Sequence, residues 1–444
     1  MPDLPVVLDR TTSDPLHRQL SARVRDLVAD GVLPRGARLP SSRALAADLG
    51  VSRSVTEQAY DQLLAEGWLE TRRGSGTYVA TAGHATAAAP PRRSAPAAPP
   101  LVRLDAGTPW IDPRHGAGWR RAWREVSAAT PPRGYDDARG LPELRAALAE
   151  RIGRTRGLRV DPDEVLVTGG TTDGLRHLLD VLAPGSVALE DPGYRAAVET
   201  VRAAGRDVVD LPAGRPVTDL RGSAAAYVTP AHQHPLGLVM SAPDRLTLLA
   251  SAHTAAAVVV EDDYDSEFRY DVAPVPALAA LDRRRVAYVG TASKSVAPSL
   301  RLGWVVPPPD LLDTVCRRRS ARHDGVSWPV QRAFVALLRD GYVDKVVRSA
   351  RRVYAERAPR VAEVLAPCAM PAGPSAGMYS TWLVDQRRAL AARDAARRAG
   401  FDVPLLTDYT RGSGLTGLVV GFGGVTDAEL DRALAALRRG LEAG

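Results

Sequence analysis

One lysine stands in a segment whose neighbours suit a phosphate group. The run GTASKS, residues 290–295, follows a short apolar stretch, and its Lys294 is one of only two lysines in the chain. The hydroxyls of Thr291 and Ser293 and the guanidinium of Arg301 could bind the same phosphate. A lysine held beside such a site can form a Schiff base with an aldehyde. A lone lysine after a strand is usually a solvated surface residue, but the phosphate ligands on both sides argue against that here.

Two further segments carry groups that suit the same kind of cofactor. The run TGGTTDG, residues 168–174, lies between an expected strand and an expected helix, where glycines, hydroxyls and a helix N-terminus favour a phosphate. The run EDDY, residues 261–264, ends another expected strand. A pyridoxal ring needs a carboxylate beside its nitrogen and a phenol or similar donor near its 3′ oxygen. Taken alone, a plain glycine turn and an acidic strand end explain these two segments better.

Alternating strands and helices must position these groups. Short apolar runs predict buried strands at residues 165–167, 225–228, 258–260, 286–289 and 304–306. A helix after the first of them is marked by Leu175, Leu178, Leu179 and Leu182. Residues 417–441 are expected to form a strand and an amphipathic helix. This alternation predicts an α/β domain with a mostly parallel sheet that is covered on both faces.

The stretch from Thr81 to Pro100 divides the chain. It is rich in Ala and Pro and has almost no large apolar residues, so it cannot bury enough surface to fold and is expected to form an extended spacer. The sequence therefore predicts a small N-terminal domain over residues 1–80, a linker over 81–100 and a large domain over 101–444.

The N-terminal part has the pattern of three short helices and a basic hairpin. Ser41 is expected to cap the second helix, Gly50 to end it, and Ser52 or Ser54 to start the third. Residues 68–79 are expected to form the hairpin, with a glycine turn. The third helix of such a unit can enter the major groove of DNA while the hairpin lies along the backbone or minor groove. A small helical domain with a solvated basic hairpin is the plainer alternative. One face of the first helix carries Leu16, Leu20, Val24, Leu27 and Val28.

The joint pattern is more specific than any single arginine. PLHRQL, followed by GARLPSSRALAADLGVSRSVTEQAYDQLLAEGWLETRRGSGTYV, resembles the winged helix-turn-helix of the GntR superfamily over almost its whole length. Glu57 departs from relatives that carry an arginine one turn into the recognition helix, so their operator sequence does not transfer to this chain. The resemblance implies operator DNA as a partner and, as DNA contacts, Arg43, Ser52, Arg53, Ser54, Arg73 and Gly74.

Motifs in both parts together resemble the MocR subfamily, in which a GntR winged helix is fused to a domain of the fold-type-I pyridoxal-phosphate aminotransferases. EDDYDSEFRY and GTASKSVAPSLRLGW carry most of this resemblance, and EDPGY and TPAHQHPLG add to it. It implies that Lys294 is the Schiff-base lysine, that Asp262 pairs with the pyridine nitrogen and that Tyr264 bonds the 3′ oxygen. Tyr194 would stack on the cofactor ring. The phosphate would be held by Thr171, Thr172, Thr291, Ser293 and Arg301.

Two departures from the aminotransferase pattern weaken an enzymatic interpretation. Aminotransferases usually carry Asn before the Pro-x-Gly of the ring-contact loop, and this chain has His234 there, as a different hydrogen-bond partner for the cofactor. Val419 stands where they usually carry the arginine that binds the substrate carboxylate, and Arg411 is the nearby candidate for that role. Members of this fold form dimers with the cofactor site at the subunit interface, so the resemblance also implies a homodimer.

Composition and cysteine count limit the partners, metals and cellular locations that we expect for the protein. The formal net charge of +7 favours anionic partners, but the basic residues are spread along the chain. Cys316 and Cys368 give neither a disulfide framework nor a metal-ligand spacing, so no metal is expected. There is no signal-like segment at the N-terminus, and the longest apolar runs fall short of the ~18 residues that a membrane helix needs. We therefore expect a soluble, cytoplasmic protein with no membrane partner.

The sequence thus favours a transcription regulator that uses pyridoxal phosphate as a sensor. Lys294 would hold the cofactor as an internal aldimine, and an amine or amino-acid effector would exchange with the lysine. Alternatively, the vitamin itself is the signal. The rival hypothesis is an active aminotransferase with an accessory DNA-binding domain, and a third is a DNA-binding protein whose cofactor domain is degenerate.

Overall fold

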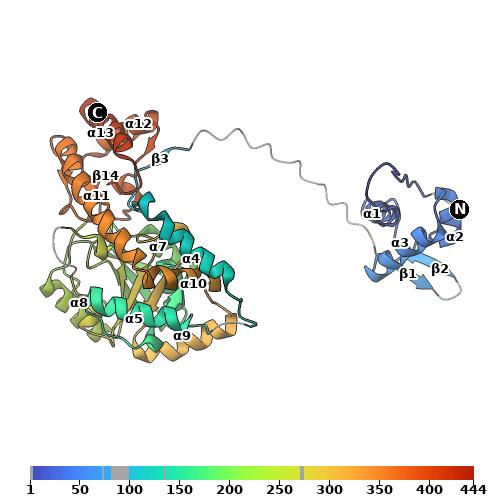
Figure 1. Ribbon diagram of the computed structural model, residues 1–444, viewed down its shortest axis with the longest axis horizontal. Coiled ribbons are helices and arrows are strands. Elements are labelled where there is room, and N and C mark those ends of the chain that lie inside the picture. The colour runs from blue at the N-terminus through green and yellow to red at the C-terminus, as the bar shows by residue number, and fades with distance from the viewer. Residues whose placement is uncertain (1–3, 73–74, 82–99, 135–136, 271–274) are drawn as a thin grey trace. The chain divides into compact units, whose positions relative to one another are not determined.

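The computed structural model of the chain describes residues 4–72, 75–81, 100–134, 137–270 and 275–444 (Figure 1). The chain divides into two compact units, Met1–Ala98 and Pro99–Gly444. The predicted linker, residues 81–100, falls almost wholly on residues outside the described ones. Its extended form and the predicted domain boundaries therefore stay predictions.

The described residues of the first unit form three helices and a two-stranded hairpin. The side chain of Ser41 accepts a hydrogen bond from the backbone N–H of Ala44 at 3.2 Å, which confirms it as the cap of the second helix. Gly50 ends that helix in the left-handed conformation, with a φ of 62°, and Ser52 precedes the third. The elements are α1 (Leu16–Ala29), α2 (Ser42–Leu49), α3 (Arg53–Ala65), β1 (Leu69–Arg72) and β2 (Gly76–Val79).

A seven-stranded sheet forms the centre of the second unit, in the order β4-β10-β9-β8-β7-β5-β6. The strands β9, β8, β7, β5 and β6 pair in parallel, and β10 runs antiparallel to both β9 and β4. The mostly parallel sheet is as the sequence predicts. The strands are β4 (Leu166–Thr168), β5 (Ser186–Asp191), β6 (Val208–Pro212), β7 (Ser223–Val228), β8 (Val258–Asp263), β9 (Val286–Thr291) and β10 (Gly303–Val306).

Apolar side chains of this sheet point alternately into two separate cores. Along β8, Val259 belongs to one core cluster, whereas Val258 and Val260 belong to the other. Both faces are therefore covered, which explains why the strands are continuous apolar runs in the sequence. The helices of this region are α4 (Gly116–Ala128), α5 (Pro142–Arg156), α6 (Thr171–Leu179), α7 (Arg195–Ala203), α8 (Ala242–Ala255), α9 (Pro309–Arg322), α10 (Trp328–Arg339) and α11 (Tyr342–Leu365).

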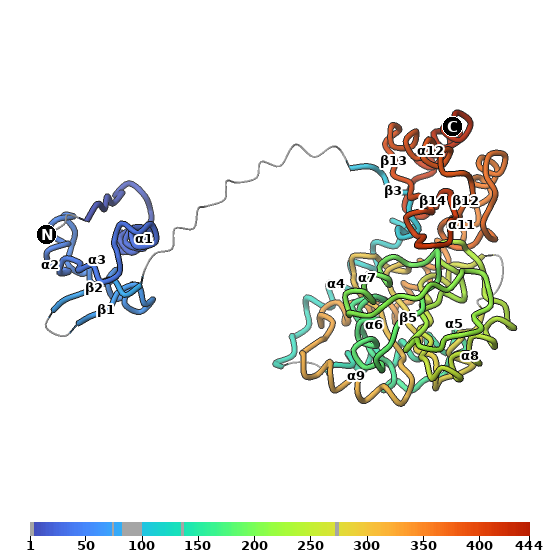
Figure 2. Tube along the Cα trace, turned by 180° about the vertical axis from the view of Figure 1, so that it is seen from behind, coloured from blue at the N-terminus to red at the C-terminus, as the bar shows by residue number. Residues whose placement is uncertain are grey.

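Smaller sheets and two helices form the remainder of the second unit and lie together at the top of that unit in Figure 2. Strand β3 (Val102–Arg103) pairs in parallel with β13 (Phe401–Asp402). A segment that precedes the strands of the large sheet in the chain therefore lies beside one that follows them. A three-stranded sheet joins β11 (Met370–Pro371), β12 (Tyr379–Leu383) and β14 (Gly417–Gly421). The packed helices are α12 (Gln386–Arg398) and α13 (Asp427–Ala443), so the predicted strand and helix over residues 417–441 are confirmed.

Candidate functional site

Ten residues that the sequence singles out for a cofactor line one cavity of about 450 Å³ in the second unit. They come from segments far apart in the chain, from the start of α6 to the loop after β9. Cavities of roughly 300–1,000 Å³ are usual for small organic ligands. The ten are Thr171, Thr172, Tyr194, His234, Asp262, Tyr264, Thr291, Ser293, Lys294 and Arg301.

Lys294 lies in the turn that follows β9. Its Nζ donates a hydrogen bond to the carbonyl oxygen of Gly107 at 2.7 Å. Removal from water lowers the pKa of the Lys294 ammonium, and nearby carboxylates, chiefly that of Asp105, oppose part of this effect. A lowered pKa increases the share of the neutral amine, which is the form that attacks an aldehyde.

Asp262 lies near the end of β8 and is fully buried. One carboxylate oxygen, Oδ2, accepts a hydrogen bond from the hydroxyl of Tyr227. The other, Oδ1, is buried without a partner among the described residues. Burial raises the pKa of Asp262 to about 7. A buried oxygen without a partner is costly, so this carboxylate suits a ligand group that brings a proton to it.

The start of α6 and the turn after β9 bring donors to the same cavity. Gly170 precedes α6 with a φ of 112°, and a Cβ on it would lie 3.3 Å from Nη2 of Arg301. In the turn after β9, the backbone N–H of Ser293 donates to Oγ1 of Thr291 at 3.1 Å. Free backbone N–H groups at a helix start, hydroxyls and a guanidinium together form an anion site.

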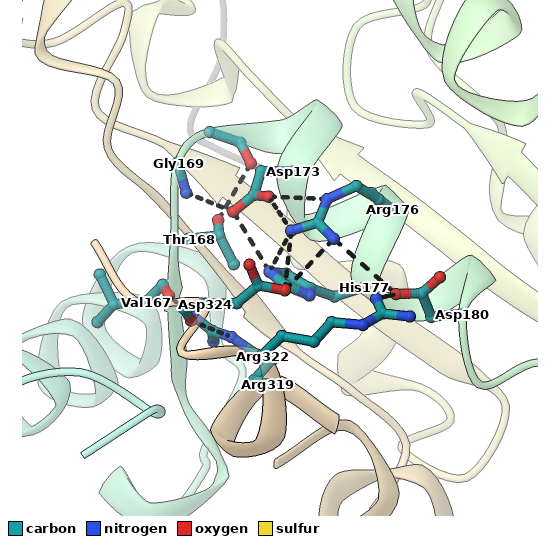
Figure 3. Close-up of polar contacts among 11 residues, drawn as sticks. Val167, Thr168, Gly169, Asp173, Arg176, His177, Asp180, Arg319, Arg322 and Asp324 are labelled. Atoms are coloured by element: carbon teal, nitrogen blue, oxygen red, sulfur yellow. Dashed lines mark hydrogen bonds and ion pairs between the residues drawn. The ribbon is translucent and has the colours of Figure 1, made fainter. Parts of the chain in front are cut away.

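An ionic network supports α6 from the side of α9 (Figure 3). Oδ2 of Asp173 accepts from the backbone N–H of Gly169 at 2.8 Å, and its Oδ1 accepts from Nη2 of Arg176 at 2.9 Å. Arg319 of α9 donates to the carbonyl oxygen of Val167 at 2.6 Å. These contacts hold the turn between β4 and α6, and they partly neutralise the acidic charge of Asp173 near the anion site.

Four tyrosines surround the imidazole of His234. Its ring lies edge-on to those of Tyr194, Tyr264, Tyr379 and Tyr409, with centroids 5.2–5.8 Å apart. Burial, with smaller effects of the Lys294 and His232 charges, lowers the pKa of His234 to about 3. The ring is therefore neutral at physiological pH and presents one donor and one acceptor nitrogen.

Tyr264 already has two partners inside the protein. Its hydroxyl lies 2.9 Å from the carbonyl oxygen and 3.2 Å from Nδ1 of His232, and 2.8 Å from the hydroxyl of Tyr379. A phenol has one proton and two acceptor positions, so these three contacts already occupy the hydroxyl. The contact of Tyr264 with a cofactor oxygen stays a prediction, and it requires one of the existing contacts to change.

Val419 and Arg411, the two residues that the sequence resemblance relates to the binding of a substrate carboxylate, do not line the cavity. Val419 is fully buried in β14, opposite Thr381 of β12. Nε of Arg411 pairs with Asp210 at 2.6 Å, and its Nη2 donates to the carbonyl oxygens of Leu189 and Glu190 at 3.0 and 2.8 Å. Arg411 thus stabilises the edge of the sheet.

Other arginines, which the sequence does not single out, do line the cavity: Arg103, Arg195, Arg393 and Arg397. The two on α12 stand in a helix with arginines on several faces, a pattern typical of a solvated surface. No local sequence pattern singles out Arg103, because its two-residue strand is too short to be recognised from the sequence. The pairing of β3 with β13 sets Arg103 opposite Asp402, and both residues line the cavity.

The predicted DNA contacts of the first unit lie at the starts of two helices. Arg43 in the first turn of α2 is exposed, as are Ser52, Arg53 and Ser54 around the start of α3. Nε of Arg53 lies 2.7 Å from Oε1 of Glu57, one turn further along α3. Arg73 and Gly74, the predicted wing contacts, lie outside the described residues.

A buried threonine joins the two helices of this unit. Oγ1 of Thr56 donates within 2.9 Å to the carbonyl oxygens of Ser42 and Arg53. Tyr60, one turn later, donates to the carbonyl oxygen of Pro40 at 2.9 Å. The start of α2 is therefore fixed against α3.

Comparison with known proteins matches both units. Residues 16–79 match the family described as bacterial regulatory proteins, gntR family, and residues 101–437 match aminotransferase class I and II. The chain is 33% identical to the HTH-type pyridoxine biosynthesis transcriptional regulator PdxR of Corynebacterium glutamicum, over 100% of this chain and 99% of the relative. It is 37% identical to the probable rhizopine catabolism regulatory protein MocR of Rhizobium meliloti, over 79% of this chain and 77% of the relative.

The chain belongs to the MocR-type GntR regulators. Its second unit is also similar to a solved aminotransferase, the α-aminoadipate aminotransferase LysN of Thermus thermophilus. The two share 25% sequence identity with a TM-score of 0.68, over 77% of this chain and 92% of that one. This MocR-type regulator therefore carries a fold-type-I aminotransferase domain after its helix-turn-helix region.

The residues of the cavity fit pyridoxal phosphate, the cofactor of that fold. The unpartnered Oδ1 of Asp262 suits the proton of a pyridine nitrogen. The anion site at the start of α6 suits the phosphate, and Lys294 has the lowered pKa that an aldehyde-binding lysine needs. The described residues hold no cluster of ligands for a metal ion, and none of the described helices is long and apolar enough to cross a membrane.

Proposed function

We propose that this MocR-type regulator binds pyridoxal phosphate in the cavity and uses it to sense a small molecule that changes its affinity for operator DNA. The observation that carries the proposal is the meeting of ten predicted cofactor residues around one cavity, with Lys294 among them. The helix-turn-helix of the first unit supplies the DNA-binding part.

Each part of the cavity has a separate task in this proposal. Asp262 would hold a proton on the pyridine nitrogen through Oδ1, while Tyr227 fixes its Oδ2. Thr171 and Thr172 at the start of α6 and Thr291, Ser293 and Arg301 near β9 would hold the phosphate. When bound, pyridoxal phosphate supplies an aldehyde carbon that reacts reversibly with primary amines.

The chain's own groups prepare the cavity for that chemistry. Burial lowers the pKa of Lys294 and so raises the share of the neutral amine, the form that acts as a nucleophile. The neutral ring of His234, held among four tyrosines, would contact the cofactor without adding a charge. Tyr194 lines the same cavity and would cover a ring face.

On the DNA side, Arg43, Ser52, Arg53 and Ser54 would contact the duplex, with Arg73 and Gly74 at the wing. We further propose a homodimer, because two helix-turn-helix units can then bind two half-sites. A small molecule changes the affinity for DNA only as far as it binds the two conformations of the dimer with different free energy. The signal is either an amine effector or pyridoxal phosphate itself.

The attachment of the cofactor tests this proposal. The full chain is loaded with pyridoxal phosphate, treated with borohydride and digested, and the modified peptide is identified by mass spectrometry. We expect the modification on Lys294 and its loss in Lys294→Ala, whereas Lys345→Ala, at an exposed position of α11, keeps it. Modification of the Lys294→Ala variant at another residue, with unchanged absorbance, would contradict the assignment.

An aminotransferase is the second candidate function. The chain is 32% identical to the 2-aminoadipate transaminase of Thermus thermophilus, over 50% of this chain and 58% of that protein. Against sustained transamination stands the buried Val419 at the position where the sequence resemblance places a substrate-binding arginine. Steady-state assays with amino acids and keto acids separate the two functions.

A further inference from the structure

The residues that precede α1 pack against the first unit in a defined course. Residues 4–15 belong to no helix or strand, and we call them the N-terminal arm. Val6 of the arm is buried among the apolar side chains of the unit, and Leu4 and Leu8 pack beside them. The DNA contacts that the sequence predicts all lie later in the chain, so the proposed function gives the arm no task.

Gln19 of α1 holds the middle of the arm. Its Oε1 accepts from the backbone N–H of Asp9 at 2.8 Å, and its Nε2 donates to the carbonyl oxygens of Asp9 and Asp14 at 2.9 and 2.8 Å. Oδ1 of Asp9 in turn accepts from the backbone N–H and the hydroxyl of Thr11, at 2.8 and 2.6 Å. These bonds fix the chain on both sides of Arg10.

The side chain of Arg10 reaches from the arm to the end of α2. Its Nη2 donates to the carbonyl oxygen of Gly50 at 2.7 Å and to that of Leu49 at 3.3 Å. The last carbonyls of a helix have no partner within it and carry the negative end of its dipole, so they attract a cation. The guanidinium is therefore held at the turn between α2 and α3.

This contact leaves part of the guanidinium unused. Nε and Nη1 of Arg10 have no hydrogen-bond or ion-pair partner among the described residues, and the residue is exposed. The adjacent carboxylate, that of Asp9, bonds to Thr11 instead. A guanidinium carries N–H groups on all three nitrogens in a fixed fork, so those on Nε and Nη1 stay available to a second acceptor.

The guanidinium lies close to the start of α3, where DNA contacts are expected. Gly50 stands two residues before Ser52, so their Cα atoms are no more than about 7.6 Å apart, twice the spacing of consecutive Cα atoms. In a helix-turn-helix the start of the second helix enters the major groove, whose two edges are lined by phosphates. Arg10 therefore brings a positive charge in a fixed place to this end of α3.

We propose that Arg10 binds a phosphate of the operator backbone through Nε and Nη1, while its Nη2 stays on the carbonyls of α2. The N-terminal arm is then a further part of the DNA-binding surface, besides the helix starts and the wing. This inference rests on the proposed function, because it takes operator DNA to meet the start of α3. A phosphate carries no base identity, so the contact adds affinity for every DNA sequence alike.

The salt dependence of DNA binding tests this contact. The full chain is titrated with an operator selected from random DNA and with an unrelated duplex, between about 50 and about 200 mM salt. Each phosphate that a protein neutralises contributes about 0.9 to the slope of log affinity against log salt. We expect Arg10→Ala and Arg10→Gln to reduce this slope by about 0.9 for each bound protomer, and to weaken binding to both duplexes by a similar factor, roughly 3-fold or more.

Three variants separate the charge of Arg10 from its tie to α2. Arg10→Gln keeps an N–H donor for the carbonyls but has no charge for a phosphate. Arg10→Lys keeps the charge, so we expect it to keep the salt slope of the wild type and to lose part of the affinity, because it lacks the fork. Arg23→Ala, at an exposed position of α1, is the matched control and should change neither quantity. Circular dichroism checks the folding of every variant.

Gln19 tests whether the arm presents Arg10 to the duplex. We expect Gln19→Ala to weaken binding in the wild-type background, because it releases the backbone of Asp9 and Asp14. In the Arg10→Ala background the same change should have no further effect, since two residues that act through one contact do not give additive losses. Additive losses in the double variant would overturn the role of the arm in presenting Arg10.

The salt slope also separates this inference from the proposed function. An unchanged slope in both Arg10→Ala and Arg10→Gln overturns the inference even if affinity falls, because Arg10 then only ties the arm to α2. The proposed function still stands in that case if Arg43→Ala and Arg53→Ala reduce the slope. A wild-type chain that selects no sequence from random DNA overturns both.

Discussion

The hydroxyl of Tyr227 on β7 holds one oxygen of Asp262 on the neighbouring strand β8 and leaves the other free. The contact fixes the carboxylate of Asp262, a residue of the cavity wall, so that its buried Oδ1 is held in one orientation. An orientation that is set before binding reduces the ordering that a ligand must cause.

Replacement of this phenol therefore tests the cofactor site. We expect Tyr227→Phe to weaken pyridoxal-phosphate binding by about 10-fold or more, since a hydrogen bond to a charged group contributes roughly 1.5–3 kcal/mol. The measurement is a titration followed by visible absorbance. Tyr288→Phe is the control, because Tyr288 makes the corresponding 2.6 Å contact to Asp263, which does not line the cavity. Equal losses in both variants would show that only general packing is affected.

Because Asp262 is buried, we expect the stability of the cofactor-free protein to depend on pH. Burial raises its pKa to about 7 in the folded chain, whereas in the unfolded chain it ionises near 3.9. The stabilisation from this group is therefore complete below about pH 4 and is lost as the pH rises through about 7. Asp262→Asn cannot ionise.

We therefore expect Asp262→Asn to lose less stability than the wild type between about pH 5 and about pH 8. Denaturant unfolding at each pH measures the difference. Asp313→Asn, at an exposed position on α9, serves as the control and should follow the wild type. Parallel pH profiles for wild type and Asp262→Asn would rule out the raised pKa.

The DNA surface gives a prediction that depends on salt. Arg43→Ala and Arg53→Ala should each weaken operator binding, and the salt dependence should fall by about one ion for each lost phosphate contact. Arg23→Ala, exposed on α1, is the matched control. Residues 1–80 alone should bind more weakly than the full chain, because one half-site is lost. Equal affinity of the two would count against the dimer.

Glu57 should limit the contacts of Arg53 with DNA, because its Oε1 lies 2.7 Å from Nε of Arg53. We expect Glu57→Ala to raise affinity for random-sequence DNA, because it frees the Arg53 guanidinium and removes a negative charge that would repel phosphate at the proposed DNA surface. Specific affinity should rise less, or fall if the carboxylate reads a cytosine. Unchanged binding to random DNA would show that this pair does not lie at the interface.

The lack of a charged group at Val419 predicts little or no sustained transamination. A bidentate arginine would have to hold the substrate carboxylate through two successive half-reactions, and Arg411 is bound to Asp210 and the sheet edge. Steady-state assays across an amino-acid panel measure this directly. Turnover of roughly 1 per second or more would favour the enzyme over the sensor.

Much of the fold follows from local patterns in the sequence. The capping by Ser41, the apolar runs of β7, β8 and β9 and the glycine-rich start of α6 are all short-range signals. Strands β5 and β6 were not predicted. β5 ends in Glu190 and Asp191, and only Leu211 of β6 is buried, so neither strand is a long apolar run.

The cavity was predictable only where its residues lie in recognisable motifs. Lys294, Asp262 and the hydroxyls beside them have such motifs, although their roles remain predictions. Tyr227 lies in the middle of an apolar strand, and nothing local shows that its hydroxyl meets Asp262. Arg103 and Asp402 meet at the cavity through the pairing of β3 with β13, which joins segments about 300 residues apart in the chain.

The most direct test of the central claim is the operator affinity of the full chain in three states. The protein is measured without cofactor, with pyridoxal phosphate, and with pyridoxal phosphate plus an amine probe, on an operator selected from random DNA. Coupling between a ligand site and a DNA site is typically about 5- to 150-fold. We predict a difference of at least about 5-fold between two of the states, and no such difference in Lys294→Ala. The same operator affinity in all three states of the wild-type protein would contradict the claim that the cofactor site controls DNA binding.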